Sequence, residues 1–222
     1  MSGRALLAAL LAVLLLGGVT AAGAAPRRAP ASQKTPASRG LLTAAELIEK
    51  VEKARAGQET LVGEFTQRKR LSLFRDELRS TGRFAFRSPG KLRWEYLTPD
   101  PSVILLDGAR VTVKTPGQKS VTYDLGRQPG LKALLERLLA ALGPGSLKAA
   151  TQDFDLKVTG PQALLLVPRG DLAKHLVAME MRFDAAWQVA GLALREKNGD
   201  QTDVTFAGLK RNVKVDDAAF RP

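Results

Sequence analysis

The sequence contains no cysteine among its 222 residues. Disulfide bonds, a thiol nucleophile and a zinc–thiolate site are therefore excluded. A lipid-modified N-terminal cysteine is excluded as well, because an acyl group would have no sulfur to attach to. The protein is therefore not expected to be a lipoprotein itself.

Other residues with catalytic chemistry are scarce. The single histidine, His175, stands next to Lys174 at an expected strand start, where a lone histidine is far more often a surface residue than a base. The S-x-x-K stretch at residues 88–91 falls in a β-turn. Residues 117–120 lack the upstream glycine and the following helix of a phosphate loop. The carboxylates do not show the spacing of metal ligands. A catalytic carboxylate pair of the glycosidase type is defined by its position in space, so the sequence does not exclude one. The sequence therefore predicts no catalytic residue, no metal and no cofactor, so the protein is not expected to be an enzyme.

Long apolar runs are also missing, except at the N-terminus. Arg4 precedes an apolar run at residues 5–19, and small residues follow at 22–25. This is the three-part pattern of a secretory signal peptide. The run is shorter than the roughly 20 residues that span a bilayer. We therefore expect residues 1–25 to be a cleaved signal peptide that exports a soluble protein; the alternative is a membrane anchor.

Residues 26–40 consist mainly of Pro, Ala, Ser and Arg. A segment of this composition buries little apolar area, so a disordered linker is expected. Residues 41–222 are enough for one domain with a substantial core.

The chain is strongly basic, with a formal net charge of +12. Such a charge suits nucleic acid, anionic lipid headgroups or an acidic partner, or it simply keeps the surface solvated. Export argues against nucleic acid as a partner.

Hydrophobic periodicity predicts two helices, at residues 42–55 and 130–142. Thr43 and Glu46 form a capping box at the start of the first. Elsewhere apolar residues recur at every second position, which predicts β-strands, and turn sequences such as Asp107-Gly108 separate these strands. The predicted strands, in meander order, are 61–74, 77–87, 91–97, 102–106, 110–115, 120–125, 154–158, 163–168, 176–184, 188–198 and 202–209.

A sheet of ten or eleven strands must curve strongly or split into two sheets. Each predicted strand has one polar face, so one side of the sheet is expected to be exposed to solvent. The predicted fold is mainly β with α: an unclosed antiparallel β-barrel with helices packed in or over its concave face. In residues 91–97, strict alternation places Leu92, Trp94 and Tyr96 on that face. Such residues form an ordinary core in any β fold, or they line a ligand cavity. The candidate cavity residues are Phe65, Phe84, Phe86, Leu92, Trp94, Tyr96, Ile104, Leu106, Val111 and Val113.

Several segments resemble the periplasmic outer-membrane lipoprotein carrier family, LolA. GEFTQ at residues 63–67 is similar to the family's G-x-F-x-Q opening strand. Gly82-Arg83-Phe84, followed by SPGKLRWEY at 88–96, resembles its R-P-G-x-(F/L)-R-W-x-Y hairpin. Residues 98–108 and 206–220 are similar to the next strand and to the closing F-x-P segment. The resemblance covers roughly residues 42–222 and is strongest in 60–110.

The resemblance implies a non-enzymatic periplasmic carrier, with acyl chains of lipoproteins in the concavity. Its implied partners are lipoproteins, an inner-membrane ABC transporter of the Lol type and an outer-membrane acceptor, and a monomer is expected. The alternative keeps the fold but carries or senses another lipid or a glycolipid.

One position departs from the family. The arginine that usually precedes the proline, and is linked to lid closure, is Ser88 here. Arg87 lies one residue earlier and would point to the other face of a regular strand. Either a β-bulge turns the Arg87 side chain to the inner face, or the opening of the cavity is controlled differently in this protein.

The leucine-rich helix at 130–142 is either a plug that moves when acyl chains enter or a fixed core helix. The gating candidates are Arg87, Leu131, Leu135 and Leu138.

Overall fold

The computed structural model describes residues 41–72, 77–127, 129–143 and 146–221. The predicted signal peptide and the predicted linker lie outside these residues. The elements, in chain order, are α2 (Ala44–Arg55), β1 (Thr60–Arg70), β2 (Glu77–Arg87), β3 (Lys91–Thr98), β4 (Ser102–Asp107), β5 (Arg110–Lys114), β6 (Val121–Asp124), η1 (Leu125–Arg127), α3 (Pro129–Leu142), α4 (Leu147–Ala150), β7 (Phe154–Gly160), β8 (Ala163–Pro168), η2 (Gly170–Lys174), β9 (Leu176–Phe183), β10 (Val189–Glu196), β11 (Gln201–Arg211) and η3 (Asp217–Phe220).

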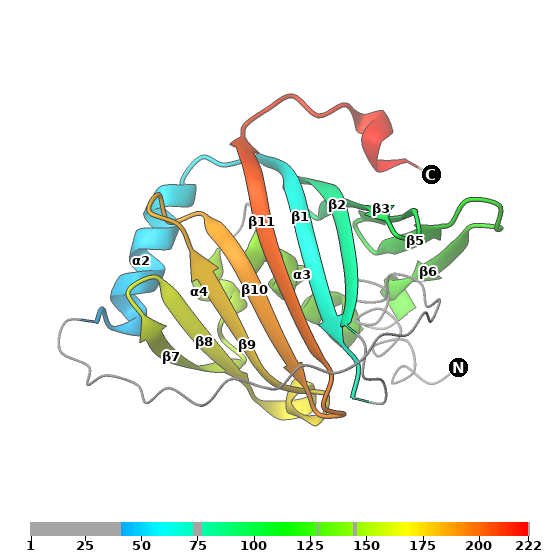
Figure 1. The fold of residues 1–222 in the computed structure, drawn as a ribbon. Coiled ribbons are helices and arrows are strands. Elements are labelled where there is room, and N and C mark those ends of the chain that lie inside the picture. The colour runs from blue at the N-terminus through cyan, green and yellow to red at the C-terminus, as the bar shows by residue number, and fades with distance from the viewer. Residues whose placement is uncertain (1–40, 73–76, 128, 144–145, 222) are drawn as a thin grey trace.

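The strands form one antiparallel sheet in the order β6-β5-β4-β3-β2-β1-β11-β10-β9-β8-β7. It consists of two meanders joined side by side where β1 pairs with β11 (Figure 1). Among the described residues, the outermost strands β6 and β7 are each paired on one side only and not with each other, so the barrel is not closed. The predicted unclosed antiparallel β-barrel with helices is confirmed.

The prediction of one continuous meander is wrong at two places. β1 pairs with β11, with Phe65 opposite Phe206, and the chain crosses from one sheet edge to the other between β6 and β7. No turn signal marks a pairing between segments so distant in sequence. Helices α3 and α4 occupy the crossing, and the four-residue α4 was not predicted.

Helix α2 begins at the predicted capping box. The Thr43 hydroxyl accepts a hydrogen bond from the Glu46 backbone N–H at 3.2 Å, and the Glu46 carboxylate accepts one from the Thr43 N–H at 2.7 Å. These bonds satisfy two N–H groups that have no partner inside the helix. The buried face of the helix, formed by Leu47, Ile48 and Val51, joins the main core.

The strands bury alternate residues, as their period predicted. In β3, Leu92, Trp94 and Tyr96 are buried, whereas Lys91, Arg93 and Glu95, which alternate with them, are only half-buried. Strand β4 is an exception, because Ile104, Leu105 and Leu106 are all buried. Its outer face is in contact with η3, which lies against β3 and β4 on the convex side of the sheet.

Among the residues that the structure describes, no helix combines the length and the apolar character needed to cross a membrane.

Candidate binding cavity

An apolar cavity of about 90 Å³ lies between α3 and the sheet. Strands β2 and β3 form one wall, strands β9, β10 and β11 form the other, and the C-terminal half of α3 covers it. Every lining residue is apolar. They are Phe84, Phe86, Leu92, Trp94, Leu135, Leu139, Leu142, Gly143, Met179, Val189, Leu192, Leu194, Val204 and Phe206.

Aromatic rings give the first wall its shape. Trp94 stacks on Phe65 with ring centroids 4.0 Å apart. Phe206 meets Phe84 edge-on at 5.5 Å and Trp94 at 6.2 Å, and so joins the two walls. Offset-stacked and edge-to-face contacts are the arrangements that aromatic pairs prefer. The rings that form this wall are therefore packed against one another in favourable geometries.

Gly82 explains how Phe65 reaches its position. The two residues are opposite each other in the β1–β2 ladder. A Cβ on Gly82 would lie 2.4 Å from Cζ of Phe65 and 2.1 Å from the Glu95 carbonyl oxygen. Only glycine allows the ring to lie this close to the strand.

The structure places the ten predicted cavity residues in three settings. Four of them line the cavity: Phe84, Phe86, Leu92 and Trp94. Five are buried in the same core without lining it: Phe65, Tyr96, Ile104, Leu106 and Val111. Val113, on β5, is half-buried.

Sequence reasoning missed the second wall. Its residues come from β9, β10 and β11, which were predicted as strands from their alternating apolar residues. Which of their faces borders the cavity depends on the pairing of β1 with β11, and this pairing was not predicted. The missed residues are Met179, Val189, Leu192, Leu194, Val204 and Phe206.

Helix α3 contributes one stripe to the cavity. Leu135, Leu139 and Leu142 line it at a spacing of four and three residues, which places them on one helix face. Leu135 was a gating candidate. The side chains of the other two leucine candidates, Leu131 and Leu138, lie outside the described part of the structure.

Helix α2 holds the end of α3. Nη1 of Arg55 donates hydrogen bonds to the carbonyl oxygens of Ala141 at 2.9 Å, Gly143 at 3.3 Å and Ala140 at 3.4 Å. Burial lowers the pKa of Arg55 to about 10, which the nearby Glu52 partly opposes. The side chain therefore remains charged at neutral pH.

Arg87 stands outside the cavity. The β2–β3 ladder runs to Arg87 opposite Lys91 with no register shift at this end, so no bulge turns the side chain inward. Its guanidinium donates to the Val215 carbonyl at 3.3 Å, pairs with Asp217 and lies 4.9 Å from the Phe220 ring centroid. The contact with Arg87 lowers the pKa of Asp217. Arg87 thus holds the C-terminal segment to the convex face.

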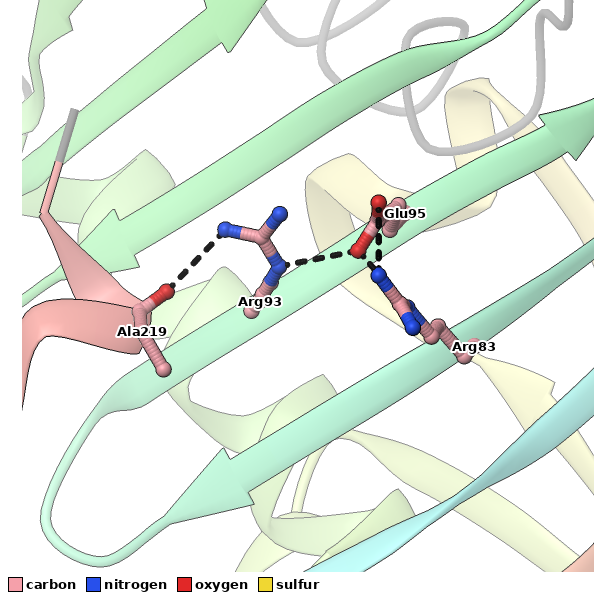
Figure 2. A network of polar contacts seen from close by, with 4 residues as sticks. All are labelled: Arg83, Arg93, Glu95 and Ala219. Atoms are coloured by element: carbon pink, nitrogen blue, oxygen red, sulfur yellow. Dashed lines mark hydrogen bonds and ion pairs between the residues drawn. The ribbon is translucent and has the colours of Figure 1, made fainter. Parts of the chain in front are cut away.

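A second set of charges on this face acts in the same way. Figure 2 shows Glu95 between Arg83 and Arg93. Oε2 of Glu95 lies 2.9 Å from Nε of Arg83 and 3.0 Å from Nε of Arg93. Arg93 also donates to the Ala219 carbonyl at 3.2 Å. Hydrogen bonding from Arg83, and then from Arg93, lowers the pKa of Glu95.

Polar groups stand beside the aromatic wall inside the barrel. The Tyr96 hydroxyl donates to Oε1 of Gln67 at 3.2 Å, and Nζ of Lys69 lies 3.8 Å from the Glu196 carboxylate. Burial raises the pKa of Tyr96 to about 12. Tyr96 is therefore neutral and packs in the core near a polar end of the interior.

Across the described ranges, no cluster of three or more His, Cys, Asp or Glu residues is placed to hold a metal ion.

The chain is similar in sequence and in fold to several known proteins. Residues 56–222 match the family model described as outer membrane lipoprotein carrier protein LolA. An outer-membrane lipoprotein carrier protein of Xanthomonas campestris is 28% identical over 175 residues, which cover 74% of this chain and 78% of the relative. One of Ralstonia nicotianae is 30% identical over 147 residues, 64% of each chain. A crystal structure of a LolA superfamily protein from Nitrosomonas europaea is 13% identical, with a TM-score of 0.46, over 82% of this chain and 98% of that one.

Proposed function

The chain belongs to the outer membrane lipoprotein carrier protein LolA family, and from this premise we propose that it shuttles lipoproteins through the periplasm with their acyl chains in the cavity beneath α3. The observation that carries the proposal is the cavity, whose lining is apolar throughout. In this account the protein binds and releases and does not catalyse. The lining residues named above are proposed to contact the acyl chains.

The energetics of acyl chains explain why a carrier is needed. Each methylene removed from water contributes about 0.8 kcal/mol, so a lipoprotein with several long chains does not leave a membrane unaided at a useful rate. A carrier must cover that area in transit and still release it. A cavity with an apolar lining and a movable cover meets both conditions.

The size of the cavity indicates how loading proceeds. Its volume of about 90 Å³ is smaller than the ~150 Å³ that holds a single benzene molecule in an engineered protein cavity. A long acyl chain is therefore accommodated only if one of the elements that enclose the cavity moves. Helix α3 is the part to move, because Leu135, Leu139 and Leu142 would exchange contacts with the sheet for contacts with the chain.

The same proposal places the protein in a transport sequence. Residues 1–25 act as the export signal and residues 26–40 as a linker to the carrier domain at 41–222. An inner-membrane ABC transporter of the Lol type would load the monomeric carrier, and an outer-membrane acceptor would receive the cargo. N-terminal sequencing of the exported protein locates the cleavage site.

Depletion of the protein in its native host tests the proposal. Lipoproteins destined for the outer membrane are then expected to accumulate in the inner-membrane fraction. Correct sorting after depletion would contradict the shuttle. Mass spectrometry of lipids bound to the purified protein gives the second measurement, and a free lipid or glycolipid in place of lipoprotein would favour the alternative cargo.

A further inference from the structure

We infer that Glu52 and Arg55 of α2 form a clasp that holds α3 and α4 over the cavity and sets how readily the cavity opens. The two residues are called the α2 clasp below. The inference rests on the proposed function, because opening matters only if acyl chains enter beneath α3. It concerns positioning, since neither residue lines the cavity.

Arg55 holds one side of the junction between α3 and α4. The last carbonyl groups of a helix have no partner inside it, and this end carries a partial negative charge. A single nitrogen of Arg55 donates to three carbonyl oxygens at the end of α3, the shortest bond being 2.9 Å to Ala141. The guanidinium therefore fixes the end of α3 next to Leu142 and Gly143, which line the cavity.

Glu52 holds the other side of the same junction. Its Oε1 accepts hydrogen bonds from the Lys148 backbone N–H at 3.0 Å and from the Ser146 hydroxyl at 3.1 Å. Ser146 in turn caps α4 through the Ala149 N–H at 3.1 Å. Residues three apart share a helix face, so Glu52 and Arg55 reach the junction together. The Arg55 guanidinium faces carbonyl oxygens, and the Glu52 carboxylate faces an N–H and an O–H donor. This complementarity fixes how α2 is aligned along the junction of α3 and α4.

The choice of charged side chains fits a cover that must open. Arg55 is almost fully buried, and a buried charge loses its hydration when the junction closes. If the junction moves away, the guanidinium is hydrated again, and this offsets part of the lost hydrogen bonding. An apolar contact at the same place would become exposed instead. The clasp therefore defines the closed position without making it irreversible.

Paired variants of α2 separate the clasp from general charge effects. Glu52→Gln/Arg55→Gln removes the clasp and leaves the net charge unchanged. Glu49→Gln/Lys53→Gln removes the same pair of charges from the exposed face of the same helix, again without changing the net charge. A second clasp variant, Arg55→Lys, keeps the charge but loses the planar donor geometry of guanidinium.

The experiment measures association of a fluorescent synthetic lipopeptide carrying three palmitoyl chains, and hydrogen exchange of the α3 amides. Loss of the clasp raises the population of the open form. Glu52→Gln/Arg55→Gln is expected to bind the probe at least fivefold faster and to exchange α3 amides faster, whereas Glu49→Gln/Lys53→Gln behaves as wild type. Arg55→Lys is expected to lie between them, and it is the deciding variant if the double variant does not fold.

Wild-type rates and unchanged α3 exchange in a folded clasp variant would overturn the inference. So would equal acceleration in the Glu49→Gln/Lys53→Gln control. A wild-type protein that binds no lipopeptide would contradict the proposed function instead. In that case the exchange data still decide whether the clasp holds α3, because they need no ligand.

Discussion

Gly143, at the end of α3, lies directly against the ring of Phe86 on β2. A Cβ on Gly143 would be 2.8 Å from both Cγ and Cδ2 of that ring, closer than real side chains approach. Both residues line the cavity. The close approach of α3 to the sheet thus depends on the absence of a side chain at this position.

Gly143→Ala is expected to push α3 away from the sheet. Overpacking of this kind costs about 1–3 kcal/mol of unfolding free energy, measured by urea denaturation. The variant is also expected to bind the lipopeptide probe faster than wild type. Gly160→Ala is the control, because its new Cβ would meet only Ala163 Cβ at an ordinary 3.5 Å. A stable Gly143→Ala variant with unchanged binding would argue against α3 as the moving cover.

A hydroxyl in the cavity is expected to weaken acyl binding. Val204 lines the cavity, and Val111 is equally buried without lining it. Val204→Thr introduces a hydroxyl that an acyl chain must desolvate at a cost of about 1–3 kcal/mol, so probe affinity should fall about fivefold or more. Val111→Thr makes the same change elsewhere in the core and should leave affinity unchanged. Equal losses at both positions would extend the binding surface to β5, as the alternation alone had suggested.

The C-terminal segment is expected to contribute stability but not binding. Phe220 is buried on the convex side, where Arg87 lies 4.9 Å from its ring centroid. Phe220→Ala should lower the unfolding free energy by about 3–5 kcal/mol, as expected for a buried phenylalanine. Probe affinity of the folded variant should remain that of wild type. A large loss of affinity would mean that the convex face is coupled to the cavity.

Acid is expected to weaken the fold partly through Glu95. Its pKa in the folded protein lies below the ordinary value of 4.5, chiefly because of the hydrogen bond from Arg83. The stabilisation is therefore fully present above that ordinary value and is lost as pH falls through the lowered pKa. Glu95→Gln should be less stable than wild type at pH 7, and the difference should shrink in urea titrations at progressively lower pH. Glu64→Gln, an exposed carboxylate on β1, is the control. A difference that does not change with pH would contradict this role.

The local structure, and the cavity wall formed by β2 and β3, could be predicted from the sequence. Periodicity located β2 at residues 77–87 and β8 at 163–168 with the observed bounds, because alternation and turn residues act over short distances. The resemblance to the family was carried by the β1–β3 region, which holds Phe84 and Trp94. Strand order depends on β1–β11 pairing, which no short segment encodes, so Val204 and Phe206 were missed.

The contacts that position α3 could not be predicted for a similar reason. Arg55 looked like an ordinary basic residue in the last turn of a helix, a common position for cations. Its partners are carbonyl groups more than 80 residues away, and backbone groups leave no sequence signal. Arg87 was considered for gating because of its place before Ser88, but the ladder puts it on the other face.

The most direct test of the account locks α3 to the sheet. A Cβ on Gly143 would lie 2.8 Å from Cγ of Phe86. The Cβ of Phe86 is one carbon–carbon bond of about 1.5 Å from that Cγ, so the two Cβ atoms would be no further apart than the roughly 4.5 Å that a disulfide spans. The chain has no other cysteine, so Phe86→Cys/Gly143→Cys forms a single defined bond. Lipopeptide loading is measured on the oxidised and the reduced forms of this one variant. The reduced form is expected to load and the oxidised form is not, whereas equal loading of both forms would show that acyl chains do not enter by displacing α3.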